Sequence, residues 1–172
     1  MQLSNRQRGG RAGFSLIELI VVVLIMTVLA GVVVPRVLDH QMAARDARRL
    51  ADLKGLQQAI EQYYLDKGAF PAADGTSWNE STDPDFISAL LKEGYLREKP
   101  EDPVNDATYQ YRYYVYNKGS YGCVGDTKFY VLGIRNFETA NFAAEHPGYF
   151  KCASRDWSAE FDYVTGGGAS FQ

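Results

Sequence analysis

The 172-residue sequence has few of the residues on which catalytic and metal sites depend. It contains two cysteines, Cys123 and Cys152, and two histidines, His40 and His146, and each pair is widely separated along the chain. A zinc knuckle or a CxxC redox site needs such residues close together, and a phosphate-binding loop needs a glycine spacing that the sequence lacks. We therefore expect a protein that is not an enzyme.

Positive charge is also in short supply, because 18 Lys and Arg stand against 21 Asp and Glu. With a formal net charge of -3 the chain has no basic excess for binding phosphates, so we expect no nucleic-acid partner. The charge is unevenly placed, however. Arg6, Arg8 and Arg11 precede the first apolar run, and no acidic residue accompanies them, so residues 1–13 form a basic leader.

The apolar run covers 14–34, which is 21 residues with one charged side chain, Glu18. A helix of about 20 residues crosses a hydrocarbon core of about 30 Å. Because basic residues precede the run, we expect a cytoplasmic N-terminus, a single pass through the inner membrane and an extracytoplasmic remainder. A secretory signal would have a shorter apolar core followed by a small-residue cleavage site. Glu18 either lies at the headgroup boundary of a plain anchor or has a partner.

A short motif surrounds the start of this run. Gly13 is followed by the aromatic Phe14, by Glu18 at the fifth place counted from Phe14, and by an apolar helix that reaches Pro35. The motif resembles the N-terminal signature of type IV prepilins and type II secretion pseudopilins. The resemblance implies that a prepilin peptidase cuts after Gly13 and methylates Phe14.

The same resemblance implies how the subunits assemble. The apolar helices would leave the membrane and pack into the core of a helical filament, where Glu18 would face the Phe14 amine of a neighbouring subunit. An inner-membrane platform protein and a cytoplasmic assembly ATPase would be further partners. A carboxylate that is poorly solvated in lipid gains from an amine in a low-dielectric bundle, which gives the implied pairing a physical basis.

Beyond residue 34 the chain becomes amphipathic. Apolar or small residues recur in steps of three and four, which predicts a helix over 35–66 with one buried face. That face consists of Ala43, Ala47, Leu50, Leu53, Leu56 or Gln57, Ile60, and Tyr63 or Tyr64. The opposite face is charged and is expected to be solvated; it carries Arg45, Arg48, Arg49, Asp52, Lys54, Glu61 and Asp66.

Residues 67–172 read as a globular head. Asp83 is a candidate N-cap for a short helix, with Pro84 at its first position. Alternating aromatic-rich runs predict strands over 109–117, 128–136 and 160–165. Alternation would place Tyr111 and Tyr113 on one face of the sheet and Tyr114 and Tyr116 on the other, where packing is a simpler role than ligand binding.

The order of these elements is similar to the pilin fold, an α+β arrangement in which a long N-terminal helix packs on a small antiparallel sheet. Residues 63–71, 94–96 and the pair Asp102-Pro103 extend the resemblance into the head. The Asp-Pro pair resembles major type II pseudopilins. Paired cysteines near the C-terminus resemble type IV pilins instead, so the sequence leaves the subfamily open.

Two features of the head stay open as well. Cys123 and Cys152 are suited to a disulfide in an exported domain, and the alternative is a pair of buried free thiols. Asp102, Asn105 and Asp106 offer oxygen ligands, but calcium takes six to eight and Asp and Asn are ordinary turn residues. A Trp that major pseudopilins show after Asp-Pro is replaced by Val104, and their acidic loop by a Gly-rich tail over 166–172. We expect no cofactor, with calcium as the open alternative.

The sequence therefore predicts a structural subunit of a type IV pilus or a type II secretion pseudopilus. It would be held in the inner membrane until it assembles into a filament in the periplasm or on the cell surface. The alternative is a signal-anchored extracytoplasmic binding domain or enzyme that never polymerises.

Overall fold

The computed structural model describes residues 13–72 and 78–168. The chain divides into two compact units, residues 1–40 and residues 41–172. One helix, α1 (Leu16–Lys67), contributes to both units, so the expected long N-terminal helix is confirmed. The two segments that the hydropathy distinguishes, 14–34 and 35–66, are parts of this helix, which begins at Leu16 and extends one residue past 66.

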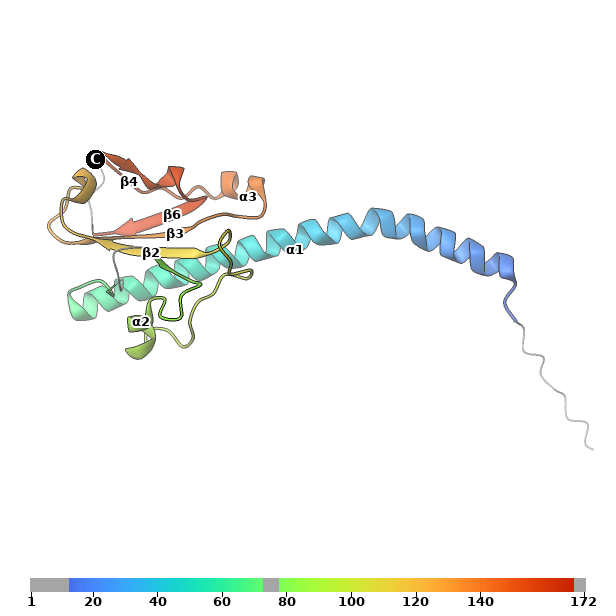
Figure 1. Cartoon of the computed structure of the whole chain (residues 1–172), viewed down its shortest axis with the longest axis horizontal. Helices are drawn as coiled ribbons and strands as arrows, with labels where there is room; N and C mark the ends of the chain where they lie inside the picture. The colour runs from blue at the N-terminus through green and yellow to red at the C-terminus, as the bar shows by residue number, and fades with distance from the viewer. Residues whose placement is uncertain (1–12, 73–77, 169–172) are drawn as a thin grey trace, which may run out of the picture. The chain divides into compact units, whose positions relative to one another are not determined.

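The second unit contains a four-stranded antiparallel sheet with the strand order β1-β2-β3-β6 (Figure 1). The strands are β1 (Asn79–Glu80), β2 (Tyr111–Tyr116), β3 (Phe129–Ile134) and β6 (Tyr163–Gly167). In the register, Tyr113 lies opposite Leu132, and Leu132 lies opposite Thr165. The three strands expected from the alternating runs are all present, and β1 is a short addition at the edge.

One face of the sheet packs on the amphipathic part of α1. Leu50, Leu53, Leu56 and Ile60 are buried, as the periodicity predicts, whereas Ala47 is exposed. Leu53, Leu56 and Ile60 share one core cluster with five residues of the sheet, Tyr111, Tyr113, Tyr130, Leu132 and Ile134. Tyr113 and Tyr111 point toward α1 and Tyr114 and Tyr116 toward the other side, because successive side chains of a strand alternate. The α+β architecture expected from the sequence is confirmed.

The other face of the sheet is covered by a second apolar layer, formed by the C-terminal part of the chain. This layer contains the hairpin of β4 (Lys151–Cys152) and β5 (Arg155–Asp156), and the 3-10 helix η2 (Trp157–Ala159). Its core consists of Cys123, Phe129, Val131, Phe150, Cys152, Trp157, Phe161 and Val164. A Cβ on Gly133 would lie 2.5 Å from the Phe161 ring, so only glycine allows this layer to approach β3 so closely.

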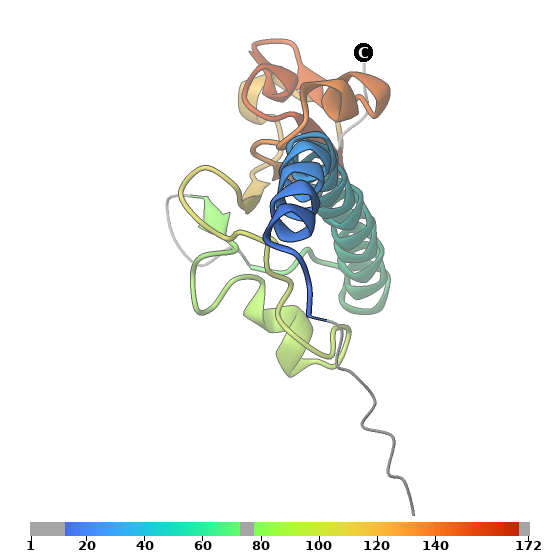
Figure 2. The same cartoon turned by 90° about the vertical axis from the view of Figure 1, so that its right-hand side faces the viewer.

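The central strand β3 is buried at all six positions, because both layers cover it. Beyond the sheet, the short helix α2 (Ser88–Lys92) and the β4–β5 layer lie on opposite sides of the head in both views (Figures 1 and 2). A further short helix, α3 (Ala140–Glu145), follows β3. The head is thus a sheet between α1 on one face and the C-terminal layer on the other.

The start of α2 differs from the sequence expectation. Asp83 was the candidate N-cap, but the residue at the cap is Ile87, in the left-handed region with φ 44°. Ile87 is buried, and its N–H donates to Asn79 Oδ1 at 2.7 Å. Asp83 instead accepts a hydrogen bond from the backbone N–H of Glu80 at 2.9 Å. The predicted cap is therefore wrong, because burial of Ile87 in the core outweighs the local capping signal.

Candidate assembly site

The N-terminal motif lies at the start of α1. Phe14 is 87% exposed, and a Cβ on Gly13 would meet no other atom within 4 Å. Ser15 immediately precedes the helix, and its backbone N–H donates to Glu18 Oε2 at 3.3 Å. The Leu19 N–H donates to the Ser15 carbonyl at 3.2 Å, which begins the helical ladder. The motif therefore combines an open chain around residues 13 and 14 with a carboxylate held one turn into the helix.

The contact between Ser15 and Glu18 is one half of a capping box, in which the N3 carboxylate satisfies the backbone N–H of the N-cap residue. The negative charge also lies at the end of the helix where the macrodipole favours it. An ionised carboxylate has about four lone-pair positions, so one backbone bond leaves capacity for an amine. Glu18 can thus stabilise its own helix and still accept a second donor.

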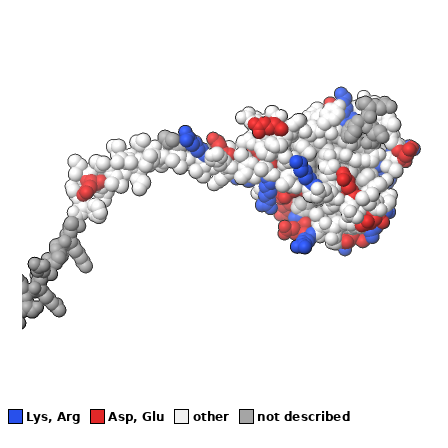
Figure 3. All heavy atoms as spheres, turned by 180° about the vertical axis from the view of Figure 1, so that it is seen from behind, with Lys and Arg blue, Asp and Glu red and all other residues white. Residues whose placement is uncertain are grey.

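The large apolar side chains of residues 16–34 are each about half exposed or more wherever their side chains are described. By length and composition α1 qualifies as a helix able to cross a membrane. In Figure 3 the start of α1 is a white, uncharged surface apart from one acidic side chain, whereas charges of both signs are interspersed over the head. Water is a poor environment for a continuous apolar surface of this kind, which indicates a lipid or protein partner.

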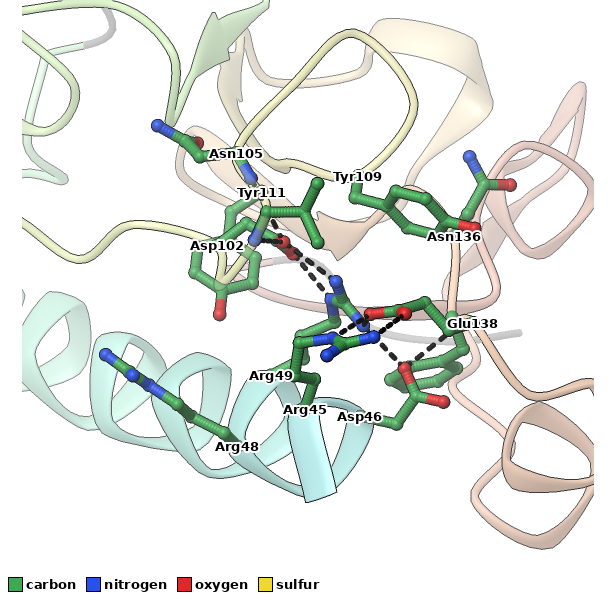
Figure 4. A network of polar contacts seen from close by, with 12 residues as sticks. Arg45, Asp46, Arg48, Arg49, Asp102, Asn105, Tyr109, Tyr111, Asn136 and Glu138 are labelled. Atoms are coloured by element: carbon green, nitrogen blue, oxygen red, sulfur yellow. Dashed lines mark hydrogen bonds and ion pairs between the residues drawn. The ribbon is translucent and has the colours of Figure 1, made fainter. Parts of the chain in front are cut away.

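A buried ionic cluster joins α1 to the head (Figure 4). At its centre is Arg49, whose side chain is 0% exposed. Its Nε donates to Asp102 Oδ2 at 2.7 Å and its Nη2 to Asp102 Oδ1 at 2.9 Å, a bidentate pair. Its Nη1 donates to Asp46 Oδ1 and to Glu138 Oε1, both at 2.7 Å. The interpretation of Arg49 as a solvated residue is therefore wrong.

The three carboxylates that surround Arg49 are themselves held in place. Asp46 accepts hydrogen bonds from the backbone N–H groups of Glu138 and Thr139, both at 2.9 Å. Arg45, also expected to be solvated, is only partly exposed and donates from Nε to Glu138 Oε1 at 2.7 Å. The cluster connects α1 to the loop at residue 102 and to the segment after β3, and so fixes the helix in the head.

The electrostatics of the cluster follow from these contacts. Burial alone would lower the pKa of Arg49, but the hydrogen bonds to Asp102 and Glu138 outweigh it and raise the pKa above its ordinary value. The hydrogen bond from Arg45, opposed by burial and aided by Arg49, lowers the pKa of Glu138 to about 2. Arg49 and Glu138 are therefore ionised at neutral pH.

The disulfide candidates lie together. Cys123 and Cys152 are 4.8 Å apart between Cα atoms, and their sulfur atoms are bonded. The bond connects the loop between β2 and β3 to strand β4, at the edge of the C-terminal layer. It therefore fastens that layer to the sheet.

The calcium candidates make other contacts in the structure. Asp102 is occupied by Arg49 and by backbone N–H groups, and the Asn105 side chain accepts from the Ser81 hydroxyl at 2.7 Å. Asp106 Oδ1 accepts two backbone N–H groups at 2.8 Å each, and these bonds lower the pKa of Asp106. In the described part of the chain, no group of three or more His, Cys, Asp or Glu side chains is placed so that it could hold a metal ion. In the structure these residues form turn contacts and an ion pair, and the absence of a cofactor stays a prediction.

Comparison with known families decides the subfamily. The model for type II secretion system (T2SS), protein G matches residues 36–127, and the model for the prokaryotic N-terminal methylation motif matches residues 6–34. The chain belongs to the type II secretion system protein G family. The open choice between type IV pilin and type II pseudopilin therefore falls to the pseudopilin side.

Curated relatives agree with this family. The type II secretion system core protein G of Escherichia coli (strain K12) is 30% identical over 125 residues, which is 71% of this chain and 80% of the relative. The core protein G of Pseudomonas aeruginosa is 34% identical over 108 residues, 61% of this chain and 75% of the relative. That of Dickeya chrysanthemi is 31% identical over 104 residues, 59% of this chain and 65% of the relative. No solved structure matches the chain.

The two family models together stop at residue 127. Beyond that point lie β3, β6 and the layer that contains Cys152 and Trp157. The role of Arg49 and the covering of the sheet by this layer were not predicted from the sequence. One local signal was present for Arg49, because Asp46 precedes it by three residues on the same helical face.

Proposed function

We propose that this protein is a structural, non-enzymatic prepilin subunit that assembles into the pseudopilus of a type II secretion system. The observation that carries the proposal is the exposed apolar helix that begins with Phe14 and Glu18, in a chain that belongs to the protein G family. A helix with this surface needs lipid before assembly and neighbouring helices afterwards. The subunit is accordingly anchored in the inner membrane with its head outside the cytoplasm, and the filament lies in the periplasm.

Processing comes first in this proposal. A prepilin peptidase removes residues 1–13 by cutting after Gly13 and then methylates the amine of Phe14. The open surroundings of Gly13 support this role, because no atom beyond its chain neighbours would obstruct even a Cβ. A bulky residue in place of Gly13, such as Leu, is expected to trap the uncut chain in the membrane.

Assembly then pairs Glu18 of one subunit with the Phe14 amine of the next. A charged carboxylate within a membrane-spanning helix costs about 2.5 to 3.5 kcal/mol on insertion scales, so an amine partner relieves an unfavourable state. The capping bond to Ser15 aims the carboxylate toward the helix start and supports this pairing. A platform protein and an assembly ATPase supply the work of extraction from the membrane.

The test compares Glu18→Ala with Thr27→Val, a control that removes another polar group of the apolar run. The Thr27 hydroxyl donates to the Leu24 carbonyl of its own helix at 2.8 Å, so its loss concerns one helix only. The amount of subunit in the membrane and the amount assembled into filaments are measured for each variant. Glu18→Ala should keep its membrane level and lose about tenfold in filament yield, which corresponds to about 1.4 kcal/mol. Equal filament yields for both variants at equal membrane levels would remove Glu18 from the assembly mechanism.

The alternative of a signal-anchored domain that never polymerises predicts a different N-terminus. Mass spectrometry of the protein from its native host should find Phe14 at the N-terminus with one added methyl group. An intact Met1, or a cut after the apolar run, would contradict the prepilin proposal whatever the filament assay shows.

A further inference from the structure

The head has a hollow of about 570 Å³ to which the proposed filament and membrane-anchoring functions assign no role. It lies on the side of β2 that faces away from α1, and we call it the aromatic hollow. Trp78, Tyr114, Tyr116, Asn117, Tyr121 and Arg155 contribute to its lining. Arg155 lies beyond residue 127, outside both family-model matches. The hollow thus combines residues of the matched region with residues of the C-terminal layer.

The aromatic rings of the hollow form one connected surface. The ring centroids of Tyr114 and Tyr116 are 4.6 Å apart, and Trp78 lies 5.9 Å from Tyr114. Tyr121 continues the series, with its centroid 5.5 Å from that of Tyr116. Aromatic pairs at these distances support one another, so the surface is largely pre-formed.

Tyr121 is held in a conformation that its own burial does not explain. Its φ is 55°, in the left-handed region that a bulky residue rarely adopts, and its side chain remains 40% exposed. Arg155 fixes the ring: Nη1 donates to the Tyr121 hydroxyl at 2.8 Å, and the guanidinium carbon lies 4.8 Å from the ring centroid. Backbone strain that the surroundings maintain at an exposed aromatic residue is typical of ligand-binding positions.

The disulfide braces this arrangement. Tyr121 lies in the 3-10 helix η1 (Ser120–Gly122), directly before Cys123, and Arg155 lies in the hairpin that begins at β4 with Cys152. The backbone N–H of Ser154 also donates to the Tyr121 carbonyl at 3.1 Å. The covalent bond therefore fixes the two segments that supply Tyr121 and Arg155.

The charge of the hollow indicates what kind of ligand it takes. Arg155 is the one charged side chain among the described residues that line it, and Glu160 neutralises it through two hydrogen bonds of 2.9 Å. Because Glu160 neutralises Arg155, the hollow offers no free positive charge to an anion such as a nucleotide and no free negative charge to a cation. The remaining polar groups are hydroxyls and the Asn117 amide, which both donate and accept hydrogen bonds.

We propose that the aromatic hollow binds a neutral saccharide. A pyranose ring has apolar C–H faces that stack on indole and phenol rings, and hydroxyls around its edge that bond to amides and hydroxyls. A volume of about 570 Å³ accommodates one or two such rings. This inference does not rest on the filament function, since the hollow is complete within one head.

The experiment is calorimetric titration of the full chain in a polyoxyethylene detergent, which has no sugar headgroup. The probes are cellobiose and N,N′-diacetylchitobiose, and the expected affinity is in the millimolar range, as for a shallow site. Trp78→Ala should weaken binding by about tenfold. Tyr149→Ala is the matched control, because Tyr149 is 60% exposed and lies outside the hollow.

A further variant separates binding from folding. Tyr121→Gly removes the ring and also the strain, because glycine adopts a positive φ without cost. Binding should weaken while the melting temperature stays level or rises, whereas a packing role alone would lower the melting temperature and leave binding unchanged.

Each outcome of the titration decides the proposal. Binding of cellobiose points to plain hexose glycans, and binding of diacetylchitobiose alone points to N-acetylated cell-wall glycans; both support a saccharide site. Absence of binding to either probe up to about 10 mM overturns it. Preferential binding of a proline-rich peptide, the other ligand that aromatic grooves bind, would also overturn the proposal. The same holds if Tyr149→Ala weakens saccharide binding as much as Trp78→Ala does.

Discussion

Replacing Arg49 with leucine is predicted to destabilise the head strongly. The side chains of Asp46 and Asp102 are 0% exposed and that of Glu138 is 9% exposed, so the change leaves three carboxylates without their shared cation. Removing one partner from a buried ionic group costs about 3 to 5 kcal/mol, because the remaining charges lose their compensation and stay out of water. Arg45 still makes a bidentate contact with Glu138 in this variant, so one of the three carboxylates keeps a cation and the loss in free energy of unfolding stays within this range.

The corresponding change in melting temperature can be estimated from the size of the second unit, residues 41–172. For a unit of about 130 residues, 1 kcal/mol shifts the melting temperature by about 3 to 4 °C, which gives a fall of about 10 to 20 °C. The measurement is thermal unfolding of the full chain in detergent, followed by near-ultraviolet circular dichroism. That signal reports the packed aromatic residues of the head, including the fully buried Trp157.

Two variants make the test specific. Arg48→Leu removes the neighbouring arginine, which is 67% exposed and lies 3.5 Å from Asp52, and should change the melting temperature by less than about 2 °C. Arg49→Lys keeps the charge but loses the planar fork, so its melting temperature should lie between those of Arg49→Leu and the unmodified protein. If Arg49→Leu melts within about 2 °C of Arg48→Leu, the cluster does not hold α1 in the head, and apolar packing alone suffices.

Three further predictions concern acid, the disulfide and calcium. Since the pKa of Glu138 falls from 4.5 to about 2 on folding, the stability that its ionised form provides is complete above pH 4.5 and is lost as the pH falls toward 2. Glu138→Gln should therefore make the urea midpoint depend less on pH between pH 4.5 and 2. An unchanged pH dependence would contradict this. The double variant Cys123→Ser, Cys152→Ser should have a free energy of unfolding lower by about 3.5 kcal/mol, since the bond closes a loop with a separation of 29 residues. Recovery of both cysteines as alkylated free thiols from unreduced protein would refute the disulfide. Treatment with EGTA should leave the melting temperature unchanged, and a fall of several degrees that calcium reverses would contradict our account of the turn residues.

Periodic patterns in the sequence predicted the parts of the fold that local chemistry controls. The three- and four-residue steps of α1 identified Leu53 and Ile60 as buried, and alternation in β2 separated Tyr113 from Tyr114. These signals are reliable because each depends only on which face of one element is apolar.

Periodic patterns in the sequence could not predict the features that depend on residues far apart in the chain. The burial of Arg49 is decided by Asp102, 53 residues away, and by Glu138, 89 residues away. The capping signal at Asp83 was overridden because Ile87 is drawn into the core. The layer around Trp157 is built from strands of two residues, which are too short to show any alternation. The processing and assembly roles of Gly13, Phe14 and Glu18 come from the motif and remain to be tested by the variants above.

The complete burial of β3 has a consequence for the order in which the chain is made. A ribosome delivers α1 and β2 before β3. Phe150 and Trp157 from the layer on the outer face of β3, and the paired strand β6, are delivered afterwards. Until they arrive, most of the apolar layer over Phe129 and Val131 is missing, and the strand is exposed to non-native pairing. The head therefore reaches its final state only once nearly the whole chain has been synthesised. Any assembly step that requires a folded head therefore excludes prematurely terminated chains, because their heads cannot complete folding.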